Sequence, residues 1–304
     1  MNNQKAIIWF DGKLVKSKDA RVHVLTHALH YGGGVFEGIR AYETDRGTAV
    51  FRLKDHVDRL FASARSLGMT ISYSKSEIAK AILKTVAANK LASCYIRPIV
   101  WYGEGQMALM PRGAKIHVAI AAWPWGAYLG EHAVLSATIS PYIRFHPQSV
   151  VPGAKIGGYY ATSILATLDA RKRGYHESIL LDHEGNVAEG PGENIFIVKR
   201  GKLITPNSPS ILPGITRASV LLIARHLGIP TAIKKITQKD LTTADEAFFS
   251  GTAAEVAPIG KIDGRNIGKG GMGFVTAKIQ TAYNDATHGR LARYTSWLSY
   301  VNRR

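Results

Sequence analysis

The stretch of this chain that most constrains its fold runs from Pro152 to Phe196 and contains two glycine-rich turns. The first turn, PGAKIGG, carries Lys155 and precedes a helix-like run. The second turn, EGPGEN, opens with Glu189 and precedes an apolar, strand-like run. Glycine allows tight turns and close approach of the backbone to another group. We therefore take Lys155 and Glu189 as candidate functional residues, each fixed beside a regular element.

The size and composition of the chain are those of a globular protein. Its 304 residues, 46% hydrophobic and 20% charged, can form one large domain or two ordinary ones with a substantial core. A run of eighteen apolar residues is missing, so we expect no membrane association. The start lacks the features of a signal peptide, and the single Cys94 excludes an internal disulfide, which together predict a cytoplasmic location. Cys94 itself lies in a strand-like run and is interpreted as a small core residue.

The formal charge of +17 raises the alternative of a nucleic-acid-binding protein. The positive residues, however, form short scattered groups, and aromatic residues do not alternate with them as in a base-stacking surface. We therefore interpret the charge as a solvated basic surface and expect no nucleic-acid partner. The sequence offers no other explanation for the excess.

Apolar periodicity predicts an α/β (α+β) protein of two domains. The expected boundaries are 1–122 for a small domain, 123–134 for a connection and 135–304 for a large domain. Helices are expected at 54–67, 76–89, 160–172, 212–228 and 274–286, with a short one at the C-terminus. Strands or hairpins are expected at 6–15, 94–102, 116–123, 177–182, 195–205 and 246–258.

Six motifs, in their order along the chain, resemble the fold-type IV pyridoxal-phosphate enzymes, and the branched-chain amino-acid aminotransferases in particular. They are YGGGVFEGIRAY at 31–42, YIRP at 95–98, the lysine turn with Tyr160, EGPGENIF at 189–196, LPGITR at 212–217 and GTA at 251–253. The resemblance implies the two-domain fold of D-amino-acid aminotransferase, with pyridoxal 5′-phosphate between the domains and a large C-terminal domain binding it.

The resemblance assigns roles around the cofactor. Lys155 is the catalytic residue, because a lysine amine can form a Schiff base with the cofactor and move protons. Glu189 keeps the pyridine nitrogen protonated, and Tyr160 bonds the phenolic oxygen. The remaining cofactor-binding residues are Arg59, Leu212, Ile215, Thr216 and Thr252, most of them phosphate ligands. Alone, each is an ordinary surface charge or helix residue, and Thr216 could also be a helix cap.

The same resemblance implies a substrate pocket. Arg97, and secondarily Arg40, would bind the second carboxylate of 2-oxoglutarate, since arginine pairs well with carboxylates. Tyr95 would contact the α-carboxylate, helped by the amides of Thr252 and Ala253. An apolar wall for leucine, isoleucine and valine would comprise Tyr31, Phe36, Gly38, Trp125 and Tyr128, although aromatic residues can equally be core.

The expected function is therefore that of a branched-chain amino-acid transaminase acting with 2-oxoglutarate. The resemblance also implies a homodimer or a higher homo-oligomer such as a hexamer, with Tyr31 and the loop at 107–110 crossing a dimer interface. D-amino-acid aminotransferases, R-selective amine transaminases and aminodeoxychorismate lyase share the lysine and glutamate framework and remain alternatives.

Three histidines, His23, His27 and His30, are spaced to share one helical face. Carboxylates or cysteines do not accompany them at ligand spacing, so we expect no metal site.

Overall fold

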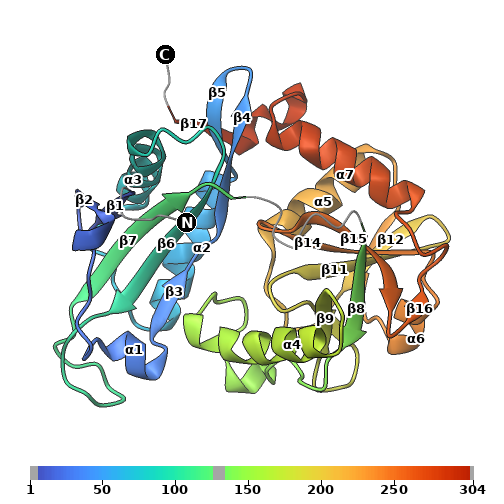
Figure 1. Cartoon of the computed structure of the whole chain (residues 1–304), viewed down its shortest axis with the longest axis horizontal. Helices are drawn as coiled ribbons and strands as arrows, with labels where there is room; N and C mark the ends of the chain where they lie inside the picture. Colours follow the sequence, from blue (N-terminus) through green and yellow to red (C-terminus); the bar gives the residue numbers. More distant parts are fainter. Residues whose placement is uncertain (1–5, 126–133, 302–304) are drawn as a thin grey trace. The chain divides into compact units, whose positions relative to one another are not determined.

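The computed structural model describes residues 6–125 and 134–301, which form two compact units. The described part of the first unit comprises residues 6–125, 154–159 and 286–301. That of the second comprises residues 134–153 and 160–285. Figure 1 shows helices and strands mixed in both. In the described ranges, none of the helices has the length and apolar character needed to cross a membrane.

In the described part of the first unit, eight strands form one antiparallel sheet. Its order is β17-β5-β4-β6-β7-β1-β2, with β3 paired to β6. The strands are β1 (Ile7–Phe10), β2 (Lys13–Lys16), β3 (Gly34–Phe36), β4 (Ile39–Thr44), β5 (Gly47–Phe51), β6 (Cys94–Tyr102), β7 (Ile116–Trp123) and β17 (Leu298–Tyr300). The helices are α1 (His27–Tyr31), α2 (Leu53–Ser66) and α3 (Lys75–Ala88), with 3-10 turns η2 (Ser17–Asp19), η4 (Gly157–Tyr159) and η5 (Ala292–Trp297).

Local sequence explains the two long helices of this unit. Helix α2 buries Val57, Leu60 and Ala64, the stripe expected from its periodicity, and contacts α3 and β3. Helix α3 begins at Ser74, whose hydroxyl accepts from the Glu77 amide while the Glu77 carboxylate accepts from the Ser74 amide. Both predicted helices are therefore confirmed to within one residue at each end.

In the described part of the second unit, nine strands form a mixed sheet that closes on itself. Its order is β10-β9-β8-β15-β14-β11-β12-β13, β16 pairs with β15, and an additional β10–β11 pairing joins six strands into a ring. The strands are β8 (Leu135–Ile139), β9 (Glu177–Leu181), β10 (Val187–Glu189), β11 (Asn194–Lys199), β12 (Lys202–Pro206), β13 (Thr231–Lys234), β14 (Glu246–Gly251), β15 (Glu255–Ile262) and β16 (Arg265–Asn266). The helices are α4 (Tyr160–Lys172), α5 (Ile215–His226), α6 (Gln238–Thr242) and α7 (Phe274–Thr287), with the 3-10 turn η3 (Pro147–Ser149).

The observed units differ from the predicted domain boundaries in two segments. Residues 154–159 and 286–301 were expected in the large C-terminal domain but belong to the first unit. Val35 forms a β-bridge with Ile156, and β17 pairs antiparallel with β5. The sequence predicted a short helix near the C-terminus, where the structure has η5 followed by β17. A three-residue strand has too little periodicity to predict, because only its distant partner makes it a strand.

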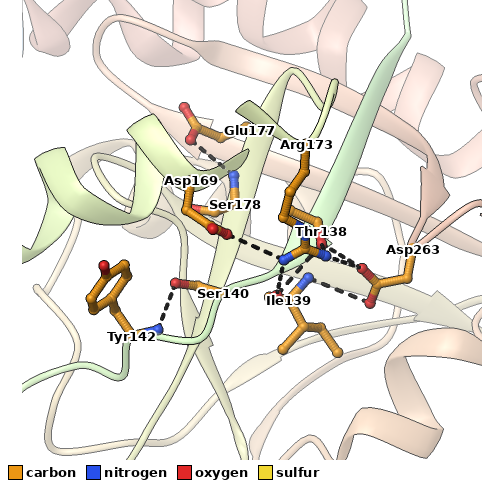
Figure 2. A network of polar contacts seen from close by, with 9 residues as sticks. All are labelled: Thr138, Ile139, Ser140, Tyr142, Asp169, Arg173, Glu177, Ser178 and Asp263. Carbon is orange, nitrogen blue, oxygen red and sulfur yellow. Dashed lines mark hydrogen bonds and ion pairs between the residues drawn. The ribbon is translucent and has the colours of Figure 1, made fainter. Parts of the chain in front are cut away.

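A polar network fixes the end of α4 in the second unit (Figure 2). Nη1 of Arg173 donates to Asp169 Oδ2 at 3.2 Å and to the Ile139 carbonyl at 3.3 Å. Its Nη2 contacts the buried Thr138 hydroxyl and lies 3.4 Å from Asp263 Oδ1. Asp263 lies in the tight turn between β15 and β16. The network therefore ties α4, the helix that begins at Tyr160, to β8 and to this turn.

We predict that Arg173→Gln lowers the free energy of unfolding, because it removes the hydrogen bonds and ion pairs of this network. The loss should be only about 1 kcal/mol, because Arg173 is partly exposed and water screens its ion pairs. Lys172→Gln makes the same charge change at an exposed neighbouring position and serves as the control. Urea unfolding of both variants measures the difference. Equal midpoints would contradict a stabilising role for the network.

Candidate active site

Lys155 is buried and its main chain is held on two sides. Its amide donates to Ser63 Oγ in α2 at 2.9 Å, and its carbonyl accepts from the Phe36 amide at 3.2 Å. Only 9% of the residue is exposed, and Nζ lies 4.8 Å from the centroid of the Phe36 ring. These two hydrogen bonds hold the Lys155 main chain in place, and the amine lies against the face of the Phe36 ring.

Aromatic residues and an arginine predicted for the substrate pocket lie together in the first unit. The Arg97 guanidinium lies 4.6 Å from the Phe36 ring, and its Nη2 donates to the Tyr95 hydroxyl at 3.1 Å. The Tyr95 ring stacks on Trp125, with centroids 4.9 Å apart. Lys155 contacts the same Phe36 ring. The structure thus joins Lys155 to the predicted pocket through Phe36.

Gly38 is required by close packing. A Cβ at this position would collide with the hydroxyl of Tyr95. The predicted space at Gly38 is therefore occupied, at least in part, by the tyrosine that was expected to contact the substrate carboxylate. A side chain at position 38 would displace Tyr95 and disturb its bond to Arg97.

The other predicted substrate residues lie in different surroundings. Arg40 is opposite Tyr95 in the β4–β6 ladder, and its guanidinium lies 5.1 Å from the Tyr42 ring. Tyr31 is 46% exposed at the end of α1, with its ring 4.7 Å from that of His27. Thr252 and Ala253 lie in the loop between β14 and β15 of the second unit, and Tyr128 lies outside the described residues.

Glu37, which sequence analysis left unassigned, is fully buried and paired with the predicted phosphate arginine. Arg59 Nε donates to Glu37 Oε1 at 2.6 Å, and Arg59 Nη2 donates to Oε2 at 2.9 Å. The Nδ1 atom of His56 lies 2.7 Å from Oε2. The available sequence signal was a charged residue, Glu37, within an apolar motif, and two basic residues, His56 and Arg59, three positions apart on α2. Sequence pattern gives no indication that these two sites meet, because they lie about twenty residues apart.

Electrostatics define the charge states of this cluster. Burial alone would raise the pKa of Glu37, but the Arg59 guanidinium and His56 hold that pKa well below its usual range. Burial lowers the pKa of His56 despite the opposing pull of Glu37, and the positive charges of Arg59 and Lys155 lower it further. Glu37 is thus ionised, and the neutral His56 donates Nδ1–H to it.

Glu189 is buried at the end of β10 and accepts from three donors in the second unit. Arg144 Nη2 lies 2.9 Å from Oε1, while Asn194 Nδ2 and the Leu212 amide lie 3.0 and 3.1 Å from Oε2. Hydrogen bonds and a nearby cation favour the ionised form of a carboxylate. Sequence analysis predicted Glu189 and Leu212 but missed Arg144 and Asn194. Asn194 faces Glu189 in the β10–β11 ladder, inside a motif that was already recognised.

The N-terminus of α5 fits an anion. Ile215 and Thr216 are buried in its first turn, and Gly214 is the N-cap residue, so Thr216 is not the capping residue that we considered as an alternative. A Cβ at Gly214 would collide with Asn194 Oδ1. Free amides and the helix dipole make such a terminus a phosphate site.

Tyr160 and the histidines complete the predicted residues. Tyr160 is the half-buried first residue of α4 and follows η4. Helix α1 begins at His27, so His23 lies outside it and the three histidines do not share one helical face, although their spacing would allow it. His27 Nε2 instead lies 2.8 Å from the Ala108 carbonyl. Across the described ranges, His, Cys, Asp and Glu do not cluster in threes at metal-binding distance.

Cys94 is buried in β6, as expected for a core residue. Burial raises the pKa of its thiol to about 12, so the thiolate does not form near neutral pH. The cysteine is thus a structural residue and not a nucleophile.

Comparison with known proteins identifies the class. The amino-transferase class IV family matches residues 34–262, and the chain belongs to this family. Within it, the chain belongs with the branched-chain-amino-acid aminotransferases: the enzyme of that name from Pseudomonas aeruginosa is 49% identical over 304 residues, covering 99% of both chains. The predicted family is therefore confirmed.

Solved structures agree with this assignment. The Escherichia coli branched-chain amino acid aminotransferase superposes with a TM-score of 0.96 at 42% identity, covering 98% of this chain and 100% of that one. The branched-chain amino acid aminotransferase from Thermobaculum terrenum, solved in its PLP-form, gives a TM-score of 0.93 at 32% identity, covering 99% and 100%. The fold prediction is confirmed, and the chain is a pyridoxal-phosphate-dependent transaminase.

The residues described above fit this cofactor. A buried lysine amine suits its aldehyde, and an ionised, buried Glu189 suits a protonated pyridine nitrogen. The first turn of α5 suits its phosphate.

We predict that Arg144→Gln lowers the free energy of unfolding by about 3 kcal/mol, because it leaves the Glu189 charge buried without its cation. In a Glu189→Gln background, the same change should cost under about 1 kcal/mol, since the uncompensated charge is absent. Urea unfolding of the four proteins measures this coupling. Equal costs in the two backgrounds would show that Arg144 does not act through Glu189.

We also predict an acid-sensitive stability that depends on His56. Its folded pKa is lowered, so the unfolded chain binds more protons below about pH 6.5 and stability falls as the pH drops through that value. The slope should reach up to about 1.4 kcal/mol per pH unit. The depressed pKa of Glu37 adds to the loss only below about pH 4.3, its unfolded value.

The variant His56→Asn keeps a donor for Glu37 but cannot take up the proton. Urea midpoints measured from pH 7.5 to 5 should decline less steeply than in wild type. His183→Asn, at an exposed position, should leave the profile unchanged. A His56→Asn profile parallel to wild type would contradict the assignment.

Proposed function

We propose that this chain catalyses reversible amino transfer from L-leucine, L-isoleucine or L-valine to 2-oxoglutarate, giving branched 2-oxo acids and L-glutamate. The proposal rests mainly on one observation: Lys155 is buried, and its amine and the Arg97 guanidinium both lie against the Phe36 ring. An amine, an apolar face and a carboxylate-binding cation are what the two substrates together require. The names of the relatives from Pseudomonas aeruginosa and Escherichia coli support the same reaction.

The proposed roles follow from the chemistry of each side chain. Bound pyridoxal phosphate supplies an electron sink for the charge that develops at the substrate α-carbon. Lys155 Nζ would take the proton from that carbon and pass it to the cofactor carbon that receives the amino group, and in the reverse half-reaction it would move a proton from there to the α-carbon of the product derived from 2-oxoglutarate. Glu189, ionised by Arg144 and Asn194, keeps a proton on the pyridine nitrogen. The Tyr160 hydroxyl donates to the phenolic oxygen.

The phosphate is proposed to be bound by the Arg59 guanidinium, by Ile215 and Thr216 in the first turn of α5, and by Thr252 in the loop between β14 and β15. Leu212 contributes in another way, because its amide holds the Glu189 carboxylate.

The substrate wall is proposed to serve two unlike side chains. Arg97 lies across Phe36, so a carboxylate can pair with the guanidinium while an alkyl group packs on Phe36 and Trp125. Tyr95, whose hydroxyl accepts from Arg97, is proposed to bind a carboxylate through the same hydroxyl. The Thr252 and Ala253 amides would complete α-carboxylate binding, and Arg40 is a secondary cation.

A homodimer is proposed from an exposed apolar surface of the first unit. Tyr31 packs on His27, and His27 contacts the Ala108 carbonyl, so the two segments expected at the interface lie side by side. This surface includes exposed Val24, Leu25, Leu29, Leu109 and Met110. Surfaces of this kind mark association sites. Assembly into a hexamer and the cytoplasmic location stay predictions.

The test of the proposed function is a visible absorption spectrum of the protein reconstituted with pyridoxal phosphate. The cofactor band should disappear on addition of L-leucine and persist with D-alanine. Disappearance with D-alanine alone would assign the chain to the D-amino-acid aminotransferase alternative. A protein that takes up no cofactor and gives no such band would overturn the proposal.

We predict that Lys155→Ala lowers turnover of L-leucine with 2-oxoglutarate by about 10²–10⁴-fold or more, since a positioned acid–base group typically contributes a factor in this range. Lys172→Ala, at the exposed end of α4, is the control and should keep wild-type turnover. Coupled assays of glutamate formation measure both. Activity of Lys155→Ala close to wild type would contradict the proposed role.

A further inference from the structure

We propose that Glu37 is a positioning residue, which holds the Arg59 guanidinium in the orientation needed for phosphate and ties it to the segment that carries Lys155. This inference rests on the proposed phosphate role of Arg59 and adds a residue that the family resemblance did not assign. Glu37 itself contacts Arg59 and His56 and is not proposed to touch the substrate.

The contacts of Glu37 leave its carboxylate little freedom. Both oxygens accept from the Arg59 fork, at 2.6 and 2.9 Å, and Oε2 also accepts from His56. The main-chain amide of Glu37 donates to the Pro98 carbonyl of β6 at 2.9 Å, so the sheet holds its backbone. Paired hydrogen bonds of this kind define the plane of a guanidinium as well as its position.

The same contacts connect Arg59 to Lys155. Phe36, next to Glu37, donates its amide to the Lys155 carbonyl, and Ser63, one turn after Arg59 on α2, accepts from the Lys155 amide. The Glu37–Arg59 pair therefore joins the strand segment and the helix that together hold the Lys155 backbone. Loss of the fork would loosen the arginine and the lysine segment at once.

A second reading of Glu37 makes the opposite prediction. If its charge only neutralised Arg59, its removal would strengthen the attraction for a phosphate dianion. If it positions Arg59, any change that breaks the fork should weaken phosphate binding, whether or not the charge is kept. Glu37→Asp separates these readings, because it keeps the charge and withdraws the carboxylate by one methylene.

The experiment compares the dissociation constants of pyridoxal phosphate and of pyridoxal, which lacks the phosphate. The dissociation constant of pyridoxal divided by that of pyridoxal phosphate measures what the phosphate contributes to binding, and this ratio falls when the phosphate is held less tightly. We expect Glu37→Asp to reduce this ratio by about tenfold, the effect of losing one charged hydrogen bond. Glu43→Asp, the same change at an exposed position of β4, should leave it unchanged. If Glu37 had only a structural role, Glu37→Asp would lower the melting temperature and weaken the binding of pyridoxal phosphate and pyridoxal equally, so the ratio would stay unchanged.

Two further variants make the result decisive. Glu37→Gln, which preserves volume, should also reduce the ratio, and it replaces Glu37→Asp if that protein does not fold. In an Arg59→Gln background, Glu37→Asp should cause no further reduction, because the group it positions is absent. An unchanged or increased ratio in the Glu37 variants would overturn the positioning role. If Arg59→Gln itself leaves the ratio at the wild-type value, the proposed phosphate role of Arg59 fails instead.

Discussion

Two buried carboxylates organise this protein, one in each unit, and each is stabilised by an arginine. Removing a carboxylate from water costs several kcal/mol unless a cation and hydrogen bonds compensate it. Glu37 is compensated by Arg59 and His56, and Glu189 by Arg144 and two further donors. Hydrogen bonds to a carboxylate are directional, so the strands and helices that bear the donor groups must be accurately positioned to stabilise these buried charges.

The path of the chain places Lys155 in a well-supported position. The chain leaves the first unit near Trp125 and returns for residues 154–159, where Ile156 bridges to Val35. The lysine proposed as the catalytic residue of this class IV aminotransferase is therefore backed by β3 and α2 and not only by its own neighbours in sequence. The turn glycines around it serve this close approach, as at Gly32, where a Cβ would press on the Gly158 backbone.

Much of the fold could be predicted from local pattern. Helices α2 and α3 and strands β6 and β7 lie where their apolar patterns placed them, because each of these elements buries its apolar residues in the core of the first unit. Two features could not be predicted. Strand β17 becomes a strand only by pairing with β5, and the short helix α1, which begins at His27 and leaves His23 outside it, was not among the expected helices.

By itself, the sequence determined the turn glycines, the amphipathic helices and the ordered motifs that identify the family. Those motifs also pointed to Lys155, Glu189 and the Phe36–Tyr95–Arg97 group. Only the tertiary structure decided that Glu37 meets Arg59 and that Arg144 meets Glu189. The physical reason is that an arginine on a helix or in a loop has the same sequence signature whether water or a distant carboxylate surrounds it. Strand register and packing alone bring such charges together, and those are properties of the folded chain.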